Sequence, residues 1–186
     1  MKSVEKGTYG YIESRKKSQI IKSGFFFLVV ALIYFAGLFV TGTRNNICTV
    51  IAILGVLPTA KVLVSYLVIC KYNTPYEDKY KELTAIEGSY VLYSDCAMSC
   101  SEKTLYVEFA AVTDNVIYCY TDNNKFDSSY FEKGVSEFIK SCGDNVEVRL
   151  FVDFNAFLKR LKALNGIEFK QNKMERVAKD FKILLL

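Results

Sequence analysis

Histidine is absent from this 186-residue chain, and its ten glycines are scattered rather than clustered. Without histidine, the commonest general base and metal ligand of proteins is missing. The sequence contains no phosphate-binding loop, dinucleotide-binding turn or hydrolase nucleophile elbow, each of which needs glycines at fixed spacings. Because no complete catalytic set is present, we expect a non-catalytic protein that needs no cofactor.

The six cysteines form no C-x-x-C pair of the kind found in zinc and redox sites. The closest spacing, Cys96 to Cys100, has no second pair to complete a metal site. We therefore expect no bound metal. In a domain that faces the cytosol, the thiols should stay reduced.

Apolar sequence is abundant near the amino end. Residues 24–40 and Ile47–Cys70 are apolar stretches separated by only six residues. A helix needs about 20 apolar residues to cross a bilayer core about 30 Å thick. The first stretch reaches this length if it begins at Ile20, because Lys22 can extend to the headgroups. We predict a transmembrane helical hairpin over residues 20–72, with spans of about 20–40 and 47–68.

Basic residues flank this hairpin unevenly. Residues 1–23 carry six basic and two acidic side chains, whereas the connecting loop carries only Arg44. Lys and Arg concentrate on cytoplasmic flanks, so we predict a two-span membrane protein with both ends cytoplasmic. The basic segment 1–19 then places Arg15, Lys16 and Lys17 near lipid headgroups. A cleaved signal peptide is disfavoured, because a signal core has about 7–15 apolar residues and a second apolar stretch follows here at once.

Lys61 interrupts the second apolar stretch, three residues after Pro58. A lysine at the bilayer centre costs about 3 kcal/mol. In one interpretation, Lys61 and Pro58 face a partner helix or an oligomer axis and form a responsive element. In the other, Lys61 lies in the cytoplasmic third of the span and extends its side chain to the lipid headgroups on that side. The first stretch supplies no acidic partner, which favours the second interpretation.

Residues 73–186 show patterns typical of a cytosolic α+β domain. In Lys103–Val112, period-two spacing puts Leu105, Val107, Phe109 and Ala111 on one face, and a turn is expected at 113–115. The predicted order after the hairpin is one helix, three strands, a helix, a strand and two helices. Their approximate ranges are 75–86, 89–94, 103–112, 116–121, 131–142, 146–152, 154–164 and 174–185.

Two local signals concern helix starts. Ser129 and Glu132 have the spacing of a capping box at the start of the fourth predicted helix. Asp153 directly precedes the next helix, where a carboxylate normally serves as the N-cap.

The order of helix, three strands, helix and strand resembles the core of the restriction-endonuclease-like fold. That resemblance implies metal-dependent cleavage of nucleic acid, which requires acidic residues around a divalent ion. The least poor candidates here are Asp95, Glu108 and Asp153. The lysine expected two residues after the strand glutamate is replaced by Ala110. A degenerate nuclease-like domain is therefore only a second alternative.

Charge is divided unevenly along the predicted domain. Residues 83–153 carry a net charge of −7, and residues 154–186 carry +5. Basic residues of the last two helices, including Lys173, Arg176 and Lys179, fall mostly on polar faces. They are either a solvated surface or a contact for anionic lipid, and aromatic residues are not interleaved with them as nucleic-acid binding would require.

Two functional hypotheses precede the nuclease alternative. The first is a membrane-anchored cytosolic binding or scaffold module that recognises a protein or small ligand. The alternative is an oligomeric membrane effector or sensor that uses Lys61 and Pro58. Expected partners are therefore the lipid bilayer and either another protein or a second copy of the chain.

Overall fold

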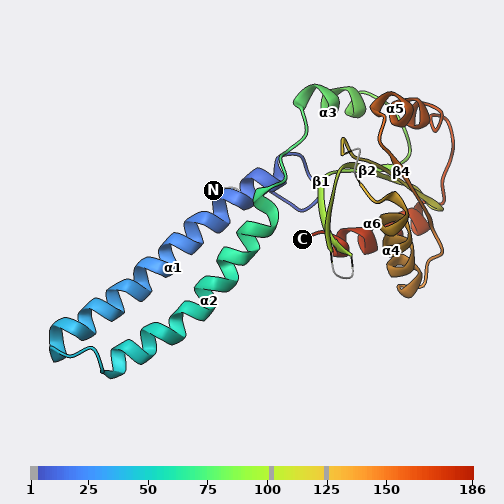
Figure 1. The fold of residues 1–186 in the computed structure, drawn as a ribbon. Coiled ribbons are helices and arrows are strands. Elements are labelled where there is room, and N and C mark those ends of the chain that lie inside the picture. Colours follow the sequence, from blue (N-terminus) through green and yellow to red (C-terminus); the bar gives the residue numbers. More distant parts are fainter. Residues whose placement is uncertain (1–3, 101–102, 124–125) are drawn as a thin grey trace. The chain divides into compact units, whose positions relative to one another are not determined.

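The computed structural model describes residues 4–100, 103–123 and 126–186. The chain separates into two compact units, each described here by itself (Figure 1). One unit, the hairpin, contains residues 12–73. The other unit, the domain, combines residues from 74 onward with those up to Tyr11. The amino-terminal segment, residues 4–11, therefore belongs to the domain, although the whole hairpin separates this segment from the rest of the domain in sequence.

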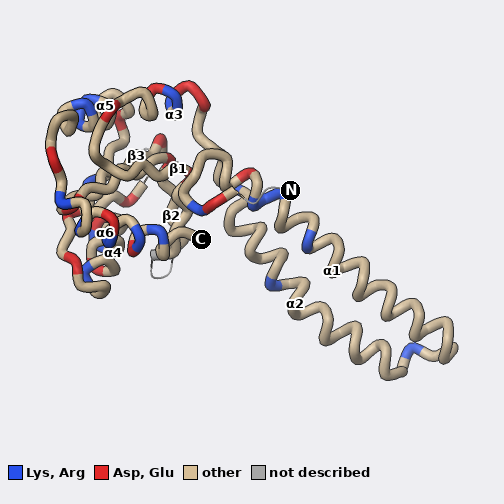
Figure 2. The backbone as a smooth tube through the Cα atoms, turned by 180° about the vertical axis from the view of Figure 1, so that it is seen from behind, with Lys and Arg blue, Asp and Glu red and all other residues tan. Residues whose placement is uncertain are grey.

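The hairpin consists of α1 (Tyr11–Thr41) and α2 (Ile47–Cys70). Both helices are long and apolar enough to cross a membrane, and their most apolar windows are only 6% and 11% buried. Figure 2 shows long stretches of both helices without charge. Asn46 caps α2 by accepting a hydrogen bond from the Thr49 amide at 2.9 Å. Helix α1 begins nine residues before the predicted span, so residues 11–19 of the basic segment assigned to 1–19 are helical.

Small residues allow α1 and α2 to approach each other closely. A Cβ atom on Gly37 would overlap the Cys48 side chain, and one on Gly55 would lie 3.0 Å from Cγ2 of Val30. Ala52 is also buried. Such contacts are the usual way in which helices pack within lipid, where the hydrophobic effect does not drive them together.

The Lys61 side chain is exposed and makes no hydrogen bond or ion pair with any residue that the structure describes. Pro58 lies inside α2. Directly after it, the Thr59 hydroxyl donates to the Gly55 carbonyl at 3.0 Å, a bond that threonine often makes to its own helix. An exposed Lys61 is compatible with both interpretations, so the roles of Lys61 and Pro58 stay predictions.

The domain contains a four-stranded mixed sheet in the order β1-β2-β3-β4. Strands β1 (Val91–Cys100), β2 (Lys103–Val112) and β3 (Val116–Tyr120) form an antiparallel meander. The expected turn at 113–115 joins β2 to β3, and the Thr113 amide donates to the Val116 carbonyl at 3.0 Å. Strand β4 (Glu147–Phe151) is parallel to β3 and follows the crossover helix α4 (Ser128–Ser141).

Helices cover both faces of the sheet (Figure 1). On one face, α4 and α6 (Gln171–Leu184) pack over Val107, Ile117 and Val148. On the other face, α3 (Glu77–Thr84) and α5 (Phe154–Lys162) pack over Phe109 and Tyr118. The predicted element order is confirmed, as is the α+β class, because the strand and helix periodicities are strong in most of these segments.

The side-chain alternation predicted for β2 is wrong in one respect. Leu105 and Val107 contact the α4–α6 side, whereas Phe109 and Ala111 contact the α3–α5 side. Regular alternation would place all four on one face. The change occurs at Glu108, and β1 changes face at the same level, so the two strands remain in register.

Strand β1 is also longer than the predicted 89–94. The part beyond the predicted end, residues 95–100, contains no β-branched or aromatic residue of the kind on which the prediction relied. It is a strand because it pairs with β2 along its whole length.

The capping box predicted for α4 is absent. The cap is Asp127, which accepts from the Tyr130 amide at 3.1 Å, and Glu132 instead accepts from the Leu150 amide of β4 at 2.8 Å. The prediction for Asp153 is confirmed, since it caps α5 by accepting from the Asn155 amide at 3.0 Å.

Candidate functional site

The backbone irregularity shared by β1 and β2 is centred on Asp95. This residue has φ of 54° and is only 1% exposed. It lies between the paired residues Ser94 and Cys96, at the level of Glu108 on β2. A non-glycine residue in the left-handed region costs energy, and such strain often occurs at functional positions. This point of the sheet is therefore a candidate functional site.

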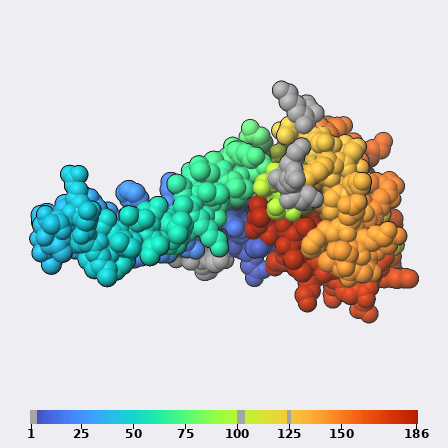
Figure 3. Space-filling view, turned by 60° about the horizontal axis from the view of Figure 1, so that its bottom comes forward, coloured from blue at the N-terminus to red at the C-terminus, as the bar shows by residue number. Residues whose placement is uncertain are grey.

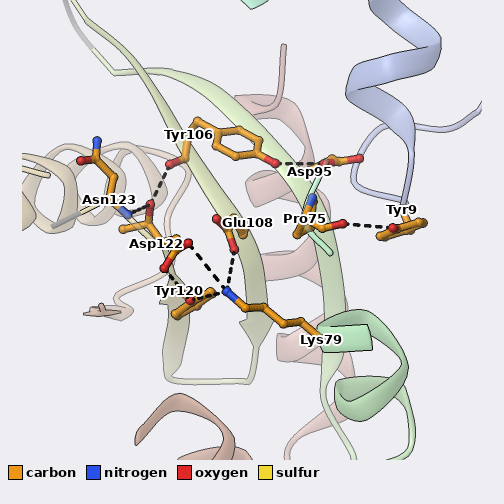
Figure 4. A network of polar contacts seen from close by, with 10 residues as sticks. Tyr9, Pro75, Lys79, Asp95, Tyr106, Glu108, Tyr120, Asp122 and Asn123 are labelled. Atoms are coloured by element: carbon orange, nitrogen blue, oxygen red, sulfur yellow. Dashed lines mark hydrogen bonds and ion pairs between the residues drawn. The ribbon is translucent and has the colours of Figure 1, made fainter. Parts of the chain in front are cut away.

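Two hydroxyl groups hold the Asp95 carboxylate. The Tyr106 hydroxyl donates to Oδ1 at 3.0 Å (Figure 4). The Thr74 hydroxyl donates to Oδ2 at 3.1 Å. Burial, together with the nearby Asp95 carboxylate, raises the pKa of Tyr106 far above its ordinary value, so its hydroxyl stays protonated and keeps donating. Thr74 follows α2 by a few residues, so this carboxylate binds the chain where it leaves the hairpin.

The ammonium group of Lys79 on α3 lies among acidic and aromatic side chains, one of which is Glu108, at the level of Asp95 (Figure 4). Nζ donates to the Tyr120 hydroxyl at 2.9 Å. It lies 3.9 Å from a carboxylate oxygen of Glu108 and 3.9 Å from one of Asp122. The same atom lies 5.1 Å from the Tyr120 ring centre and 5.4 Å from that of Phe154, within reach of cation–π attraction.

These surroundings shift the pKa values of Lys79 and Glu108. Burial opposes the charge of Lys79, but the Tyr120 hydrogen bond and the Glu108 carboxylate outweigh it, so the pKa of Lys79 lies above its ordinary value. Burial raises the pKa of Glu108, and the attraction of Lys79 offsets only part of that rise. Within the Lys79–Glu108 pair, the fold therefore favours the charged form of Lys79 and disfavours the charged form of Glu108.

Glu108→Gln is expected to flatten the dependence of domain stability on pH. Because the folded-state pKa of Glu108 is raised above its ordinary value of 4.5, its contribution is most favourable below that value. The contribution is lost as pH rises through the raised pKa. Denaturation of the full chain between pH 4 and pH 8 checks this, with the exposed Glu87→Gln as control. Equal pH dependence in Glu108→Gln and the unmodified protein would contradict the assignment.

The amino-terminal segment meets the domain at the same place. The Ser94 amide, next to Asp95, donates to the Gly7 carbonyl at 2.9 Å. The Tyr9 hydroxyl donates to the Pro75 carbonyl at 3.0 Å, and the Tyr9 ring stacks on Tyr80 of α3 with centres 4.5 Å apart. The segments that precede and follow the hairpin are therefore both bonded to the sheet around Asp95, and also to each other.

Further contacts fasten this segment to the last residues of the domain. Lys6 Nζ donates to the Leu185 carbonyl at 2.8 Å, and the Tyr11 hydroxyl donates to the Leu186 carbonyl at 2.8 Å. The Leu186 amide in turn donates to the Ala97 carbonyl of β1 at 2.8 Å. Gly7 and the 185–186 segment thus occupy hydrogen-bonding positions along β1, which is an edge strand of the sheet.

Of the predicted acidic candidates, the structure brings Asp95 and Glu108 together on neighbouring strands, whereas Asp153 is engaged as the cap of α5. Within the described residues, no group of three or more Cys, Asp or Glu side chains is arranged to hold a metal ion. Sequence reasoning missed Lys79, Tyr106 and Thr74, because each occupies an unremarkable position in a helix, strand or connection.

Among the basic residues predicted to meet lipid, Arg15, Lys16 and Lys17 lie in the first turns of α1. Lys16 Nζ donates to the Asn73 side-chain oxygen at 3.1 Å, which joins the two ends of the hairpin unit. The chain matches no protein-family model, no curated protein and no solved structure.

Proposed function

We propose that this protein is a membrane-anchored binding module, in which the hairpin spans the bilayer and the domain recognises a partner on the cytoplasmic side. One observation carries the proposal. The segment before α1 and the segment after α2 are bonded to the same sheet, through Ser94 to Gly7 and through Asp95 to Thr74.

This bonding bears directly on topology. Two helices that each cross the bilayer once return the chain to the side on which it started. The domain is assembled from residues that come before and after the hairpin in sequence. These residues must lie on the same side of the membrane, because residues on opposite sides could not bond to each other. The excess of Lys and Arg before α1 favours the cytoplasmic side for both ends.

The surroundings of Lys79 support a binding role for the domain. The Asp122 side chain is 65% exposed and the Tyr76 residue is 75% exposed, although Lys79 lies close to both. Because Lys79 already supplies the positive charge beside both groups, they suit polar and aromatic contacts with a protein partner rather than a second cation. We propose that such a partner docks where α3 covers the sheet.

The topology supplies the test. Reporter tags placed before residue 1 and after Leu186 are expected to be accessible only from the cytoplasm, and a tag within 42–45 only from outside. The chain should also stay with the membrane fraction until detergent is added. Opposite locations of the two ends, or release without detergent, would contradict the proposal.

A further inference from the structure

Helix α6 presents an outward face that combines basic residues with one apolar residue. The helix buries Val177, Phe181 and neighbouring residues against the sheet. Lys173, Arg176, Lys179 and Ile183 follow one another at helical spacings of three, three and four on the opposite face. Ile183 is 63% exposed, the largest exposed fraction of any large aliphatic side chain in the described part of the domain.

This surface is hollowed rather than flat. One hollow is lined by Lys170, Lys173 and Arg176. A second is lined by Arg176, Lys179, Asp180 and Ile183, together with residues 142–144 after the end of α4. The two share Arg176, so they adjoin along the helix. Figure 3 shows the atoms of α6 (red) beside those of α4 (orange) on this surface of the domain.

The basic side chains differ in how far they are already engaged. Arg176 forms an ion pair with Asp144 at 3.0 Å, and Lys173 donates to the Asn115 side chain at 2.7 Å. The side chains of Lys170 and Lys179 have no hydrogen bond or ion pair with any described residue. Lys173 therefore keeps its full charge beside a neutral amide, and only Arg176 is paired with a carboxylate. The two hollows together are lined by four basic side chains and by the two carboxylates of Asp144 and Asp180, so the face keeps a net positive charge.

The same helix is linked to the segment that leads into the hairpin. Lys182, in its last turn, pairs with Glu5 at 3.1 Å, and Lys6 bonds to the Leu185 carbonyl. Helix α1 begins at Tyr11, five residues beyond Lys6. A surface held by so short a connection meets its own membrane at a high effective concentration, so weak contacts suffice.

We propose that the outward face of α6 binds anionic lipid headgroups of the membrane in which the hairpin is anchored. This inference rests on the proposed anchoring. Lys170, Lys173, Arg176 and Lys179 supply electrostatic attraction, and Ile183 enters the interface between headgroups and acyl chains. Helix α5 also carries basic residues in its last turn, but none of its large apolar side chains is exposed.

The chain contains no tryptophan, so Ile183→Trp introduces a single fluorophore on this face. The full-length variant is reconstituted into vesicles of phosphatidylcholine, with or without phosphatidylglycerol, that carry brominated acyl chains. We expect a blue-shifted emission and strong bromine quenching only with the anionic lipid. High salt should reverse both, because it screens exposed charges.

Charge removal provides the matched comparison. Lys170→Gln, Lys173→Gln and Lys179→Gln together should lower the bound-to-free ratio of the helix by about a hundredfold, which abolishes the quenching. The control carries Lys140→Gln, Lys159→Gln and Lys162→Gln, which remove equal charge from α4 and α5. Its quenching should persist.

Flotation of the same vesicles separates the two failures. If the protein floats but the introduced indole is not quenched, or is quenched equally without phosphatidylglycerol or with the α6 lysines removed, the α6 inference is overturned and the anchor stands. If the protein does not float, the anchor itself fails. A blue shift produced instead by added RNA or DNA would assign the face to nucleic acid and also overturn the inference.

Discussion

Replacement of Asp95 by alanine is expected to destabilise the domain by about 3 kcal/mol, enough to raise local opening of β1 and β2 more than a hundredfold. Two effects add. The Tyr106 hydroxyl, almost fully buried, loses its acceptor, which costs about 1–3 kcal/mol. Alanine also tolerates the left-handed backbone of position 95 less well than aspartate, by roughly 1 kcal/mol.

Asp95→Asn separates these effects. Asparagine accepts the left-handed conformation and keeps one acceptor oxygen, so it should retain a large part of the lost stability. Asp153→Ala is the matched control, because it removes a carboxylate that caps a helix and should cost about 1 kcal/mol.

Hydrogen exchange of the full chain in lipid nanodiscs measures the effect in peptides from β1 and β2. If the β1 and β2 peptides lose no more protection from exchange in Asp95→Ala than in Asp153→Ala, Asp95 does not organise this part of the sheet.

The hairpin and the order of elements could be predicted from the sequence, because both depend on local patterns. Two long apolar stretches are visible without any tertiary information, despite Lys22 at the start of the first and Lys61 within the second. The helices also have clear periodicity, and the cap at Asp153 needs only its neighbours. Structure that depends on interactions between residues near each other in sequence could therefore be predicted from the sequence.

The candidate site could not be predicted in the same way. Strand β1 continues through Asp95 only because β2 pairs with it, and the face change at Glu108 depends on the same pairing. Asp95 and Glu108 could be named as acidic residues near strands, but their partners Lys79 and Thr74 come from the connection that follows the hairpin. Glu132 matches a capping pattern yet bonds to β4, because a long-range partner competes with the local one.

The docking of residues 4–11 has no signal in the sequence at all. Lys6 bonds to a carbonyl 179 positions away, and Gly7 to one strand of a sheet that begins after the hairpin. Such contacts depend on the path of the whole chain. They are nevertheless the basis of the central claim, namely that the hairpin interrupts one domain rather than preceding it.

Gly7→Ala is expected to loosen this docking strongly. Gly7 has φ of 80°, and a Cβ atom there would overlap the Tyr93 ring and lie 3.1 Å from Cδ1 of Leu185. The left-handed backbone costs alanine about 1 kcal/mol, and the overlap adds about 1–3 kcal/mol. Gly10 offers a matched control within the same segment, because its φ is 81° but a Cβ atom would meet nothing within 4 Å.

Hydrogen exchange across β1, Val91–Cys100, in the full-length Gly7→Ala and Gly10→Ala variants tests the central claim most directly. If residues 4–11 complete the domain, exchange in β1 should accelerate at least tenfold more in Gly7→Ala than in Gly10→Ala, which corresponds to about 1.4 kcal/mol. Ser94, whose amide bonds to Gly7, should lose the most protection. Identical exchange of β1 in both variants and in the unmodified protein would contradict the claim, because the amino-terminal segment would then lie apart from the sheet.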